Sequence, residues 1–208
     1  MAKIFSGSAR GATAHLVEPV ARALLRSGLS PNAVTVLGTL GVAVGAVGFA
    51  ARGHLVLGTI IVMVAAISDI IDGTMARLRG GDSSFGALLD SSLDRVADGL
   101  IFGAVAYWLA STGDLAGMVA AMLCLGGGQV VSYVKARAEG LGMSCDVGVA
   151  ERFERLVCAG VGAVLTGAFG LSWALPAALW LLAVLSVVTI GQRIWHVRRQ
   201  AAALASQR

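Results

Sequence analysis

Charged residues are scarce in this chain of 208 residues: they make up 13% of it, whereas hydrophobic residues make up 57%. A soluble domain of this size carries roughly twice that charged fraction. The hydrophobic residues gather in stretches of about 20 residues, the length of helix that crosses the core of a bilayer. The composition therefore argues against a soluble protein and predicts an integral membrane protein.

Cysteine and histidine are also scarce, with three of each. The cysteines lack CxxC spacing, and His15, His54 and His196 are scattered, so we expect no metal site or catalytic cluster built on them. Cys124 and Cys158 lie in apolar stretches, where small packing residues are expected. The sequence shows no internal repeat, no low-complexity tract and no second domain, and we expect no cleavable signal peptide.

Six stretches are apolar and long enough to span a membrane as helices. They are residues 31–52, 55–78, 86–110, 115–138, 153–170 and 174–195. Before them, Val17 to Leu25 mixes apolar residues with Arg22 and Arg26, as an amphipathic helix lying along the membrane interface does. We predict an all-α fold, a single membrane domain over residues 1–208. Its parts are an N-terminal interfacial segment (1–30), a bundle of six transmembrane helices (31–199) and a cytoplasmic tail (200–208).

Lysine and arginine lie almost entirely on one side of this predicted topology. Apart from Arg52, they fall in the N-terminal segment, between Arg193 and Arg208, or in and next to the second and fourth connections. The positive-inside rule then places both termini and the second connection in the cytoplasm. This arrangement accounts for the net charge of +4 without a nucleic-acid partner. We therefore expect a multi-pass protein of the cell membrane.

Four aspartates interrupt this apolar chain, where carboxylates are costly unless a cation neutralises them. They lie in the string Asp69-x2-Asp72-Gly73-x2-Ala76-Arg77-x8-Gly86-x3-Asp90-x3-Asp94. Spacings of three and four residues put each aspartate pair on one helix face. The loop Arg79–Ser84, with its paired glycines, breaks the helix and lets the two pairs meet at the cytoplasmic boundary. Hard oxygen ligands of this kind suit two Mg²⁺ or Mn²⁺ ions.

The commoner roles of aspartate fit this pattern less well. Isolated aspartates are usually helix caps or solvated surface residues, and we interpret Asp82 and Asp98 in that way, as loop and helix-surface residues. An EF-hand is excluded because its ligands alternate along a loop that ends in a glutamate. The pattern of four aspartates predicts a metal site. Such a site in a membrane protein indicates an enzyme that acts on a phosphate ester.

The residues between the aspartates also suit a nucleotide substrate. Gly73, Ala76 and Gly86 leave room for a flat base or a diphosphate to approach the backbone. Arg77 offers a forked pair of donors to a phosphate oxygen. All eight defined positions of the string resemble the signature of the CDP-alcohol phosphotransferases. The segment Ser30–Thr35 and the six-span layout are similar to that family as well.

The resemblance implies an activity and a role for each matching residue. The family moves a substituted phosphate from a CDP-alcohol to an acceptor alcohol and releases CMP. By resemblance, Asp69, Asp72 and Asp90 ligate one ion, and Asp69, Asp90 and Asp94 help to hold the second. Asp94 is also the implied general base. The residues implied to contact the cytidine and diphosphate are Asn32, Thr35, Gly73, Ala76, Arg77 and Gly86.

The acceptor is indicated by the fourth connection, because the aspartate motif is shared by enzymes with different acceptors. The stretches Ser132–Glu139 and Glu151–Arg155 resemble the actinobacterial phosphatidylinositol phosphate synthases. This resemblance implies that CDP-diacylglycerol donates phosphatidate to inositol 1-phosphate. It also suggests that the protein is a homodimer and that membrane lipids surround it. The residues implied to hold the acceptor phosphate are Ser132, Lys135, Arg155 and Arg193, with Arg137 and Arg152 as weaker candidates.

Several alternatives stay open at this point. The positive-inside rule places cations at the fourth connection whatever the chemistry. Glycerol 3-phosphate is a second acceptor with the same phosphate dianion. Intramembrane prenyltransferases also bind Mg²⁺-diphosphate through aspartates, but their two acidic motifs lie far apart in the chain. A cation transporter would place acidic residues near the bilayer midplane, whereas here they group at one face.

Overall fold

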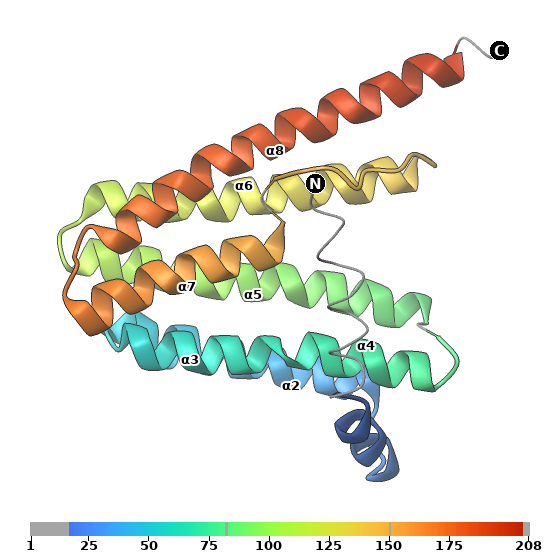
Figure 1. Ribbon diagram of the computed structural model, residues 1–208, viewed down its shortest axis with the longest axis horizontal. Helices are drawn as coiled ribbons and strands as arrows, with labels where there is room; N and C mark the ends of the chain where they lie inside the picture. Colours follow the sequence, from blue (N-terminus) through green and yellow to red (C-terminus); the bar gives the residue numbers. More distant parts are fainter. Residues whose placement is uncertain (1–16, 82, 150, 206–208) are drawn as a thin grey trace. The chain divides into compact units, whose positions relative to one another are not determined.

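The computed structural model describes residues 17–81, 83–149 and 151–205, and all regular structure within them is helical (Figure 1). Residues 17–26 are helical. The later elements are α2 (Pro31–Ala43), η1 (Val44–Phe49), η2 (Ala50–Arg52), α3 (Leu55–Ala66), α4 (Ser68–Leu78), α5 (Ser84–Ser111), α6 (Leu115–Gly140), α7 (Arg152–Phe169) and α8 (Ala174–Ala205). The all-α prediction is confirmed for the described residues. The first 16 residues of the predicted N-terminal segment, the last three of the predicted tail, and Asp82 lie outside them.

Four helical segments are long and apolar enough to cross a membrane. They are Pro31–Arg52, Leu55–Leu78, Leu115–Gly140 and Ala174–Leu204, which correspond to the first, second, fourth and sixth predicted spans. The third and fifth predicted spans fold as α5 and α7, which carry more charge. The charged residues are Asp90, Asp94, Arg95 and Asp98 in α5 and Arg152, Glu154 and Arg155 in α7. The chain is therefore a multi-pass membrane protein, and its described residues include four helical segments of clear membrane character.

The described residues form two compact units. Unit 1 contains the described part of Met1–Gly45 together with Ile60–Ala97. Unit 2 contains Ala46–Thr59 together with the described part of Asp98–Arg208. The predicted metal ligands lie in unit 1, and the predicted acceptor ligands lie in unit 2.

Unit 1 is built on the contact between α2 and α4. Ser30 caps α2 by accepting a hydrogen bond from the backbone N–H of Ala33 at 3.1 Å, and proline follows at the first helical position, where its missing N–H costs nothing. The two helices approach closely at Gly38, where a Cβ atom would overlap the Ser68 hydroxyl. This close approach brings the start of α2 beside the aspartates of α4.

The end of α4 and the start of α5 follow the sequence prediction. Gly80 and Gly81 have φ angles of 104° and 122°, a left-handed conformation that glycine adopts without a Cβ penalty. The backbone N–H of Gly81 donates to the carbonyl of Ala76 at 3.0 Å and closes the helix end. The predicted break between Arg79 and Ser84 is confirmed, and it lets α5 begin soon after α4 ends.

Residues 17–26 form an amphipathic helix that packs against the rest of unit 1. Ala21 is fully buried and packs in a small core with Val34 and Met75. Arg22 lies on the exposed side and pairs with Glu18, one turn earlier in the helix. One face of this helix therefore packs on the protein, and the opposite face carries the charges.

Unit 2 is held together by α8, which lies against both α6 and α7 (Figure 1). Its core is apolar and includes Phe102, Leu175 and Leu179. Small residues let the helices pack closely: a Cβ atom at Gly127 would lie 2.9 Å from Cβ of Ser186. The glycine run at 126–128 therefore marks a helix contact through Gly127.

Candidate functional site

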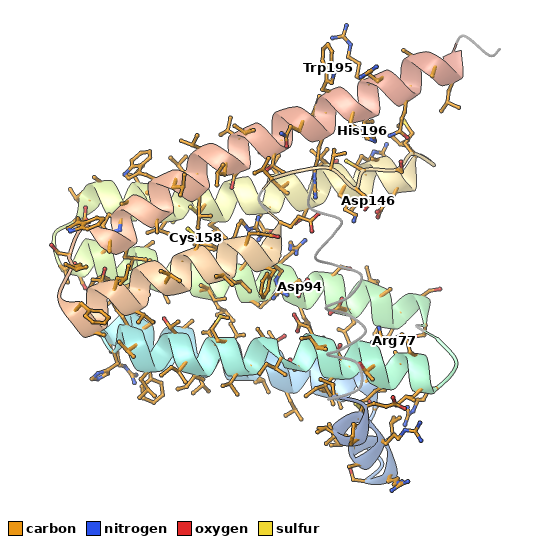
Figure 2. The ribbon with its side chains drawn as sticks, viewed as in Figure 1. Arg77, Asp94, Asp146, Cys158, Trp195 and His196 are labelled. Atoms are coloured by element: carbon orange, nitrogen blue, oxygen red, sulfur yellow. The ribbon has the colours of Figure 1, made fainter. Side chains whose placement is uncertain are left out.

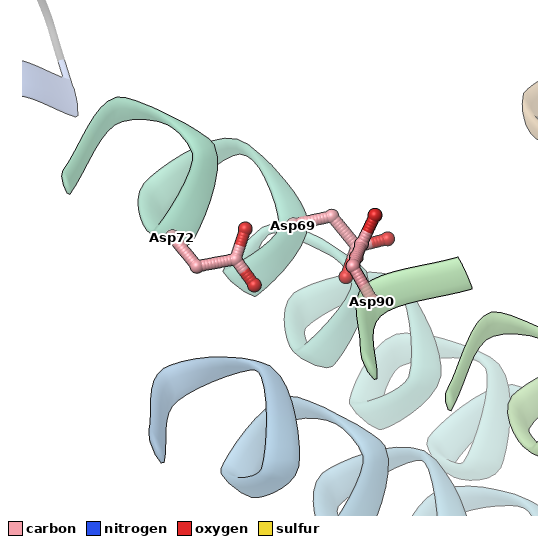
Figure 3. A group of neighbouring side chains, drawn as sticks. All are labelled: Asp69, Asp72 and Asp90. Carbon is pink, nitrogen blue, oxygen red and sulfur yellow. The ribbon is translucent and has the colours of Figure 1, made fainter. Parts of the chain in front are cut away.

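The candidate metal site lies in unit 1, where α4 and α5 bring three aspartates together. Asp69 and Asp72 come from α4 and Asp90 comes from α5 (Figure 3). One carboxylate oxygen from each residue lies within 4.8 Å of the others. We call these three residues the acidic cluster. Three of the four predicted metal ligands thus converge, as the spacing in the sequence predicted.

Asp72 is held in place by a residue that precedes it by 37 positions. Thr35, on α2, donates its hydroxyl hydrogen to Asp72 Oδ2 at 2.6 Å. Asp72 is 6% exposed and Thr35 is 7% exposed, so water competes little for this bond. A hydrogen bond of this kind fixes the orientation of a carboxylate and leaves its second oxygen for a ligand.

A pocket of about 380 Å³ opens beside the acidic cluster. Its volume lies within the range of small-molecule sites, which is about 300–1,000 Å³. The acidic cluster lines it, and so do most of the residues predicted to bind the CDP-lipid: Asn32, Thr35, Gly73, Ala76 and Gly86. Gly86 keeps the pocket open, because a Cβ atom there would lie 3.2 Å from Oδ1 of Asn32.

Arg77 is the predicted CDP-lipid ligand that does not line this pocket. Arg77 lies on α4 (Figure 2), and its Nη1 would lie 3.6 Å from a Cβ atom at Gly73. Its Nη2 donates to the Thr74 hydroxyl at 2.9 Å. Arg79 lines the pocket instead, together with Ser30 and Ser83. All three residues flank helix ends: Arg79 and Ser83 lie in the loop within the aspartate motif, and Ser30 begins the segment Ser30–Thr35 that resembles the family. Only these positions could have indicated them.

Asp94, labelled in Figure 2, lies one helical turn beyond Asp90 in α5 and does not belong to the acidic cluster as defined above. Its Oδ2 lies 3.5 Å from Nη2 of Arg95, and both side chains are partly exposed. Asp94 is therefore not among the three aspartates whose oxygens lie within 4.8 Å of one another. Its predicted roles as a ligand of the second metal ion and as the general base stay predictions.

The predicted acceptor residues lie in unit 2, and each has a partner within the protein. Arg193, from α8, is 4% exposed; its Nη1 donates to the carbonyl of Val131 at 2.6 Å and its Nε donates to that of Val147 at 2.9 Å. Lys135 Nζ lies 2.6 Å from Oδ1 of Asp146. We call Lys135, Arg155 and Arg193 the cationic cluster.

Residues 141–149, which follow α6, pack against α8 beside this cluster. Gln200 receives hydrogen bonds from Ser144 and donates Nε2 to the Ser144 carbonyl at 2.6 Å. The backbone N–H of Val149 donates to Thr189 at 3.3 Å. Cys145 is fully buried in this loop, and burial raises the pKa of its thiol, so the thiol stays protonated at neutral pH.

Asp98 corrects the sequence prediction. We interpreted it as a helix-surface residue, but it is 1% exposed, and its Oδ2 lies 2.6 Å from Nη2 of Arg155. Arg155 is itself 1% exposed, and Arg152 Nε lies 3.4 Å from the other oxygen of Asp98. The pairing joins residues more than 50 positions apart, which no local pattern reveals.

Among the other predicted acceptor residues, Ser132 donates to the Gly128 carbonyl, and Arg137 is exposed.

The acidic cluster has the chemistry of a divalent-metal site. Its donors are carboxylate oxygens, which Mg²⁺ and Mn²⁺ prefer, and Asp72 is positioned by a buried hydrogen bond. Three carboxylates close together repel one another unless a cation lies between them. The residues present therefore fit a bound metal ion.

Comparison with known proteins agrees with this geometry. Residues 29–191 match the model of the CDP-alcohol phosphatidyltransferase family. The chain is 45% identical to a phosphatidylinositol phosphate synthase of Mycobacteroides abscessus, over 92% of this chain and 87% of that protein. It is 47% identical to a phosphatidylinositol phosphate synthase of Streptomyces avermitilis, over 93% of this chain and 82% of that protein.

Solved structures of a phosphatidylinositol phosphate synthase from Mycobacterium tuberculosis are also similar. The structure with CDP-DAG bound has a TM-score of 0.84 and 42% identity, and the match covers 88% of this chain and 94% of that one. The structure in complex with manganese and citrate has a TM-score of 0.83 and 42% identity, over 87% of this chain and 88% of that one.

Proposed function

This chain belongs to the CDP-alcohol phosphatidyltransferase family, and we propose that it is a phosphatidylinositol phosphate synthase. In this proposal it transfers phosphatidate from CDP-diacylglycerol to inositol 1-phosphate and releases CMP. The observation that carries the proposal is the convergence of Asp69, Asp72 and Asp90 on one pocket. Identities of 45–47% to named synthases support it further. Family membership sets aside the prenyltransferase and transporter alternatives.

In the proposed site, the acidic cluster would hold Mg²⁺ or Mn²⁺, and Asp94 would complete the ligands of a second ion. Bound divalent ions neutralise charge on the diphosphate and make CMP a better leaving group. The manganese in the complex of the tuberculosis enzyme supports this choice of metals. Thr35 acts here by keeping the Asp72 carboxylate turned toward the pocket.

Asp94 is the proposed general base. It takes the proton of the acceptor hydroxyl as the hydroxyl oxygen attacks the phosphorus of the phosphatidyl group. A P–O bond to that phosphorus forms, the P–O bond to CMP breaks, and the bonding electrons leave with CMP. A carboxylate suits this role because it can accept a proton as the hydroxyl loses it.

The donor and the acceptor are assigned to different side chains. We assign the cytidine and diphosphate of CDP-diacylglycerol to the pocket of unit 1, with Gly73 and Gly86 leaving space, Asn32 lining it, and Arg77 or Arg79 reaching the phosphates. The pocket lining supports all of these residues except Arg77. The acceptor phosphate is assigned to Ser132 and the cationic cluster, with Arg137 and Arg152 as further candidates.

The proposed membrane arrangement has six spans in one catalytic domain. The family match runs from residue 29 to residue 191 and so includes both units, which supports a single domain. Helices α5 and α7 cross the membrane in this proposal with their charged residues turned away from lipid. Residues 17–26 lie along the interface, both termini and the site face the cytoplasm of the cell membrane, and the protein is a homodimer.

An acceptor panel tests the proposed function. The purified chain is given radiolabelled CDP-diacylglycerol, Mg²⁺ or Mn²⁺, and one acceptor at a time: inositol 1-phosphate, glycerol 3-phosphate, inositol, serine or choline. We expect a labelled lipid and CMP only when inositol 1-phosphate and metal are both present. Turnover with glycerol 3-phosphate instead would replace the proposed acceptor with the alternative one. No turnover with any alcohol would contradict the proposed function.

A further inference from the structure

A buried carboxylate in unit 2 joins α5 to two arginines of α7. Asp98 Oδ2 lies 2.6 Å from Nη2 of Arg155, and Asp98 Oδ1 lies 3.4 Å from Nε of Arg152. The side chains of Asp98 and Arg155 are each 2% exposed, whereas that of Arg152 is 21% exposed. One aspartate therefore offers a separate oxygen to each guanidinium. Charge-assisted bonds of this kind fix the direction of both partners.

The backbone of α6 closes the other side of Arg155. A Cβ atom at Gly128 would lie 2.5 Å from Nη1 of Arg155 and 2.9 Å from its Cζ, so only glycine leaves room for the guanidinium here. Ser132, one turn later in α6, donates to the Gly128 carbonyl at 3.0 Å. The Arg155 guanidinium thus lies between Asp98 and α6, next to the turn that carries Ser132.

We propose that Asp98 is a positioning residue for the acceptor phosphate, acting through Arg155 and, more weakly, through Arg152. The inference rests on the proposed function, because it requires a phosphate-bearing acceptor at Arg155. By fixing the guanidinium before the acceptor arrives, Asp98 removes the entropy cost of ordering a long side chain on binding. Its negative charge also stabilises the Arg155 guanidinium, which the fold removes from water.

The proposal differs in its consequences from a purely structural ion pair. A structural pair would lower the melting temperature when broken and would leave the ratio of the two Michaelis constants unchanged. A positioning residue acts on one substrate: its loss raises the KM for the acceptor and leaves the KM for CDP-diacylglycerol unchanged. The ratio of the two Michaelis constants therefore separates the two roles.

The test uses the full chain with Asp98→Asn, which preserves shape and removes the charge. We expect the KM for inositol 1-phosphate to rise about tenfold or more, with the KM for CDP-diacylglycerol within about twofold of the parent. Asp114→Asn is the matched control, because Asp114 only caps α6 by accepting from the N–H of Gly117 at 2.8 Å. A lower melting temperature with an unchanged ratio of Michaelis constants would overturn the proposal.

Two further variants keep the test decisive. If Asp98→Asn does not fold, Asp98→Glu keeps the charge and shifts the carboxylate by one methylene; a raised acceptor KM supports positioning, and parent values overturn it. Arg155→Lys completes a double-mutant cycle with the Asp98 variant that folds. Because Asp98 acts through Arg155, we expect the double variant to have about the same acceptor KM as Arg155→Lys alone. If the two substitutions raised the acceptor KM additively, Asp98 would not act through Arg155.

The same experiment separates failure of this inference from failure of the proposed function. If the parent enzyme uses glycerol 3-phosphate, the proposed acceptor is wrong, and the two Michaelis constants are then measured with glycerol 3-phosphate. A selective rise in that acceptor's KM still supports the role of Asp98, and an unchanged ratio still overturns it.

Discussion

The acidic cluster of unit 1 and the cationic cluster of unit 2 are organised in opposite ways. In the acidic cluster, like charges from α4 and α5 converge beside a pocket. In the cationic cluster, the three cations are paired with acceptors of the protein: Lys135 with Asp146, Arg155 with Asp98, and Arg193 with two backbone carbonyls. The first arrangement favours a bound cation between its like charges, whereas the second pairs each cation with an acceptor of the protein.

This difference suggests that the two clusters contribute to different quantities. Like charges brought together favour a bound cation and the polarisation that it provides, so the acidic cluster should control the rate of transfer. Cations already ordered by the protein bind an anion at a low entropy cost, so the cationic cluster should control the affinity for the acceptor. The predictions below test this division, in order of decreasing effect.

Loss of an acidic-cluster ligand should have the largest effect. Asp72→Asn removes a negative charge from the metal site, and we expect transfer to fall by about a thousandfold, with much weaker Mn²⁺ binding. CMP release as a function of Mn²⁺ concentration measures both. Asp114→Asn, away from the cluster, should behave as the parent does. Parent-like Mn²⁺ dependence in Asp72→Asn would show that the cluster is not the metal site.

Asp94→Asn should separate chemistry from binding. Removing a general base lowers kcat by about a hundredfold or more, while the donor pocket beside the acidic cluster is left intact. We expect CDP-diacylglycerol to bind with parent affinity, measured by equilibrium binding, while single-turnover CMP release slows. A parent-like rate would mean that another group accepts the proton.

Thr35→Val tests the hydrogen bond that orients Asp72. Valine keeps the shape of threonine but cannot donate to Asp72 Oδ2. Loss of a residue that orients a metal ligand weakens metal affinity by about tenfold or more, and we expect that loss in a Mn²⁺ titration. Thr39→Val is the control, because Thr39 donates only to the carbonyl of Thr35 one turn earlier in α2. Equal Mn²⁺ affinities in the two variants would show that the Thr35 hydrogen bond does not help Asp72 to bind the metal.

The smallest effect is expected at the exposed pair of the cationic cluster. In the proposed site, Asp146 would compete with the acceptor phosphate for Lys135, and the Asp146 side chain is 67% exposed. An exposed pair contributes at most about 1 kcal/mol, so Asp146→Asn should lower the acceptor KM by only about twofold to threefold. Steady-state kinetics at low salt measure this change. A higher KM would mean that Asp146 helps to bind the acceptor.

The acidic cluster was predictable from the sequence because its geometry is local. Asp69 and Asp72 lie three residues apart in one helix, and Gly80 and Gly81 end that helix soon before α5 begins. Helix periodicity and turn chemistry are enough to bring such residues together. The same reasoning predicted the helices and, to within a few residues, most of their ends.

The partners of the cationic cluster could not be predicted, because they depend on tertiary packing. Asp98 lies 57 positions before Arg155, and Val131 lies 62 positions before Arg193. Asp98 follows Asp94 by four residues, so the motif spacing continues to it, but no local pattern indicates that α7 covers it. Thr35 was predicted as a substrate ligand; its contact with Asp72 likewise depends on how α2 packs against α4.

The most direct test of the central claim is anomalous diffraction from crystals of the chain grown with Mn²⁺ and CDP-diacylglycerol. We predict a manganese peak at coordination distance, about 2.2 Å, from carboxylate oxygens of Asp69, Asp72 and Asp90, next to the diphosphate. A map with well-defined nucleotide density and no manganese peak among these three carboxylates would contradict the account.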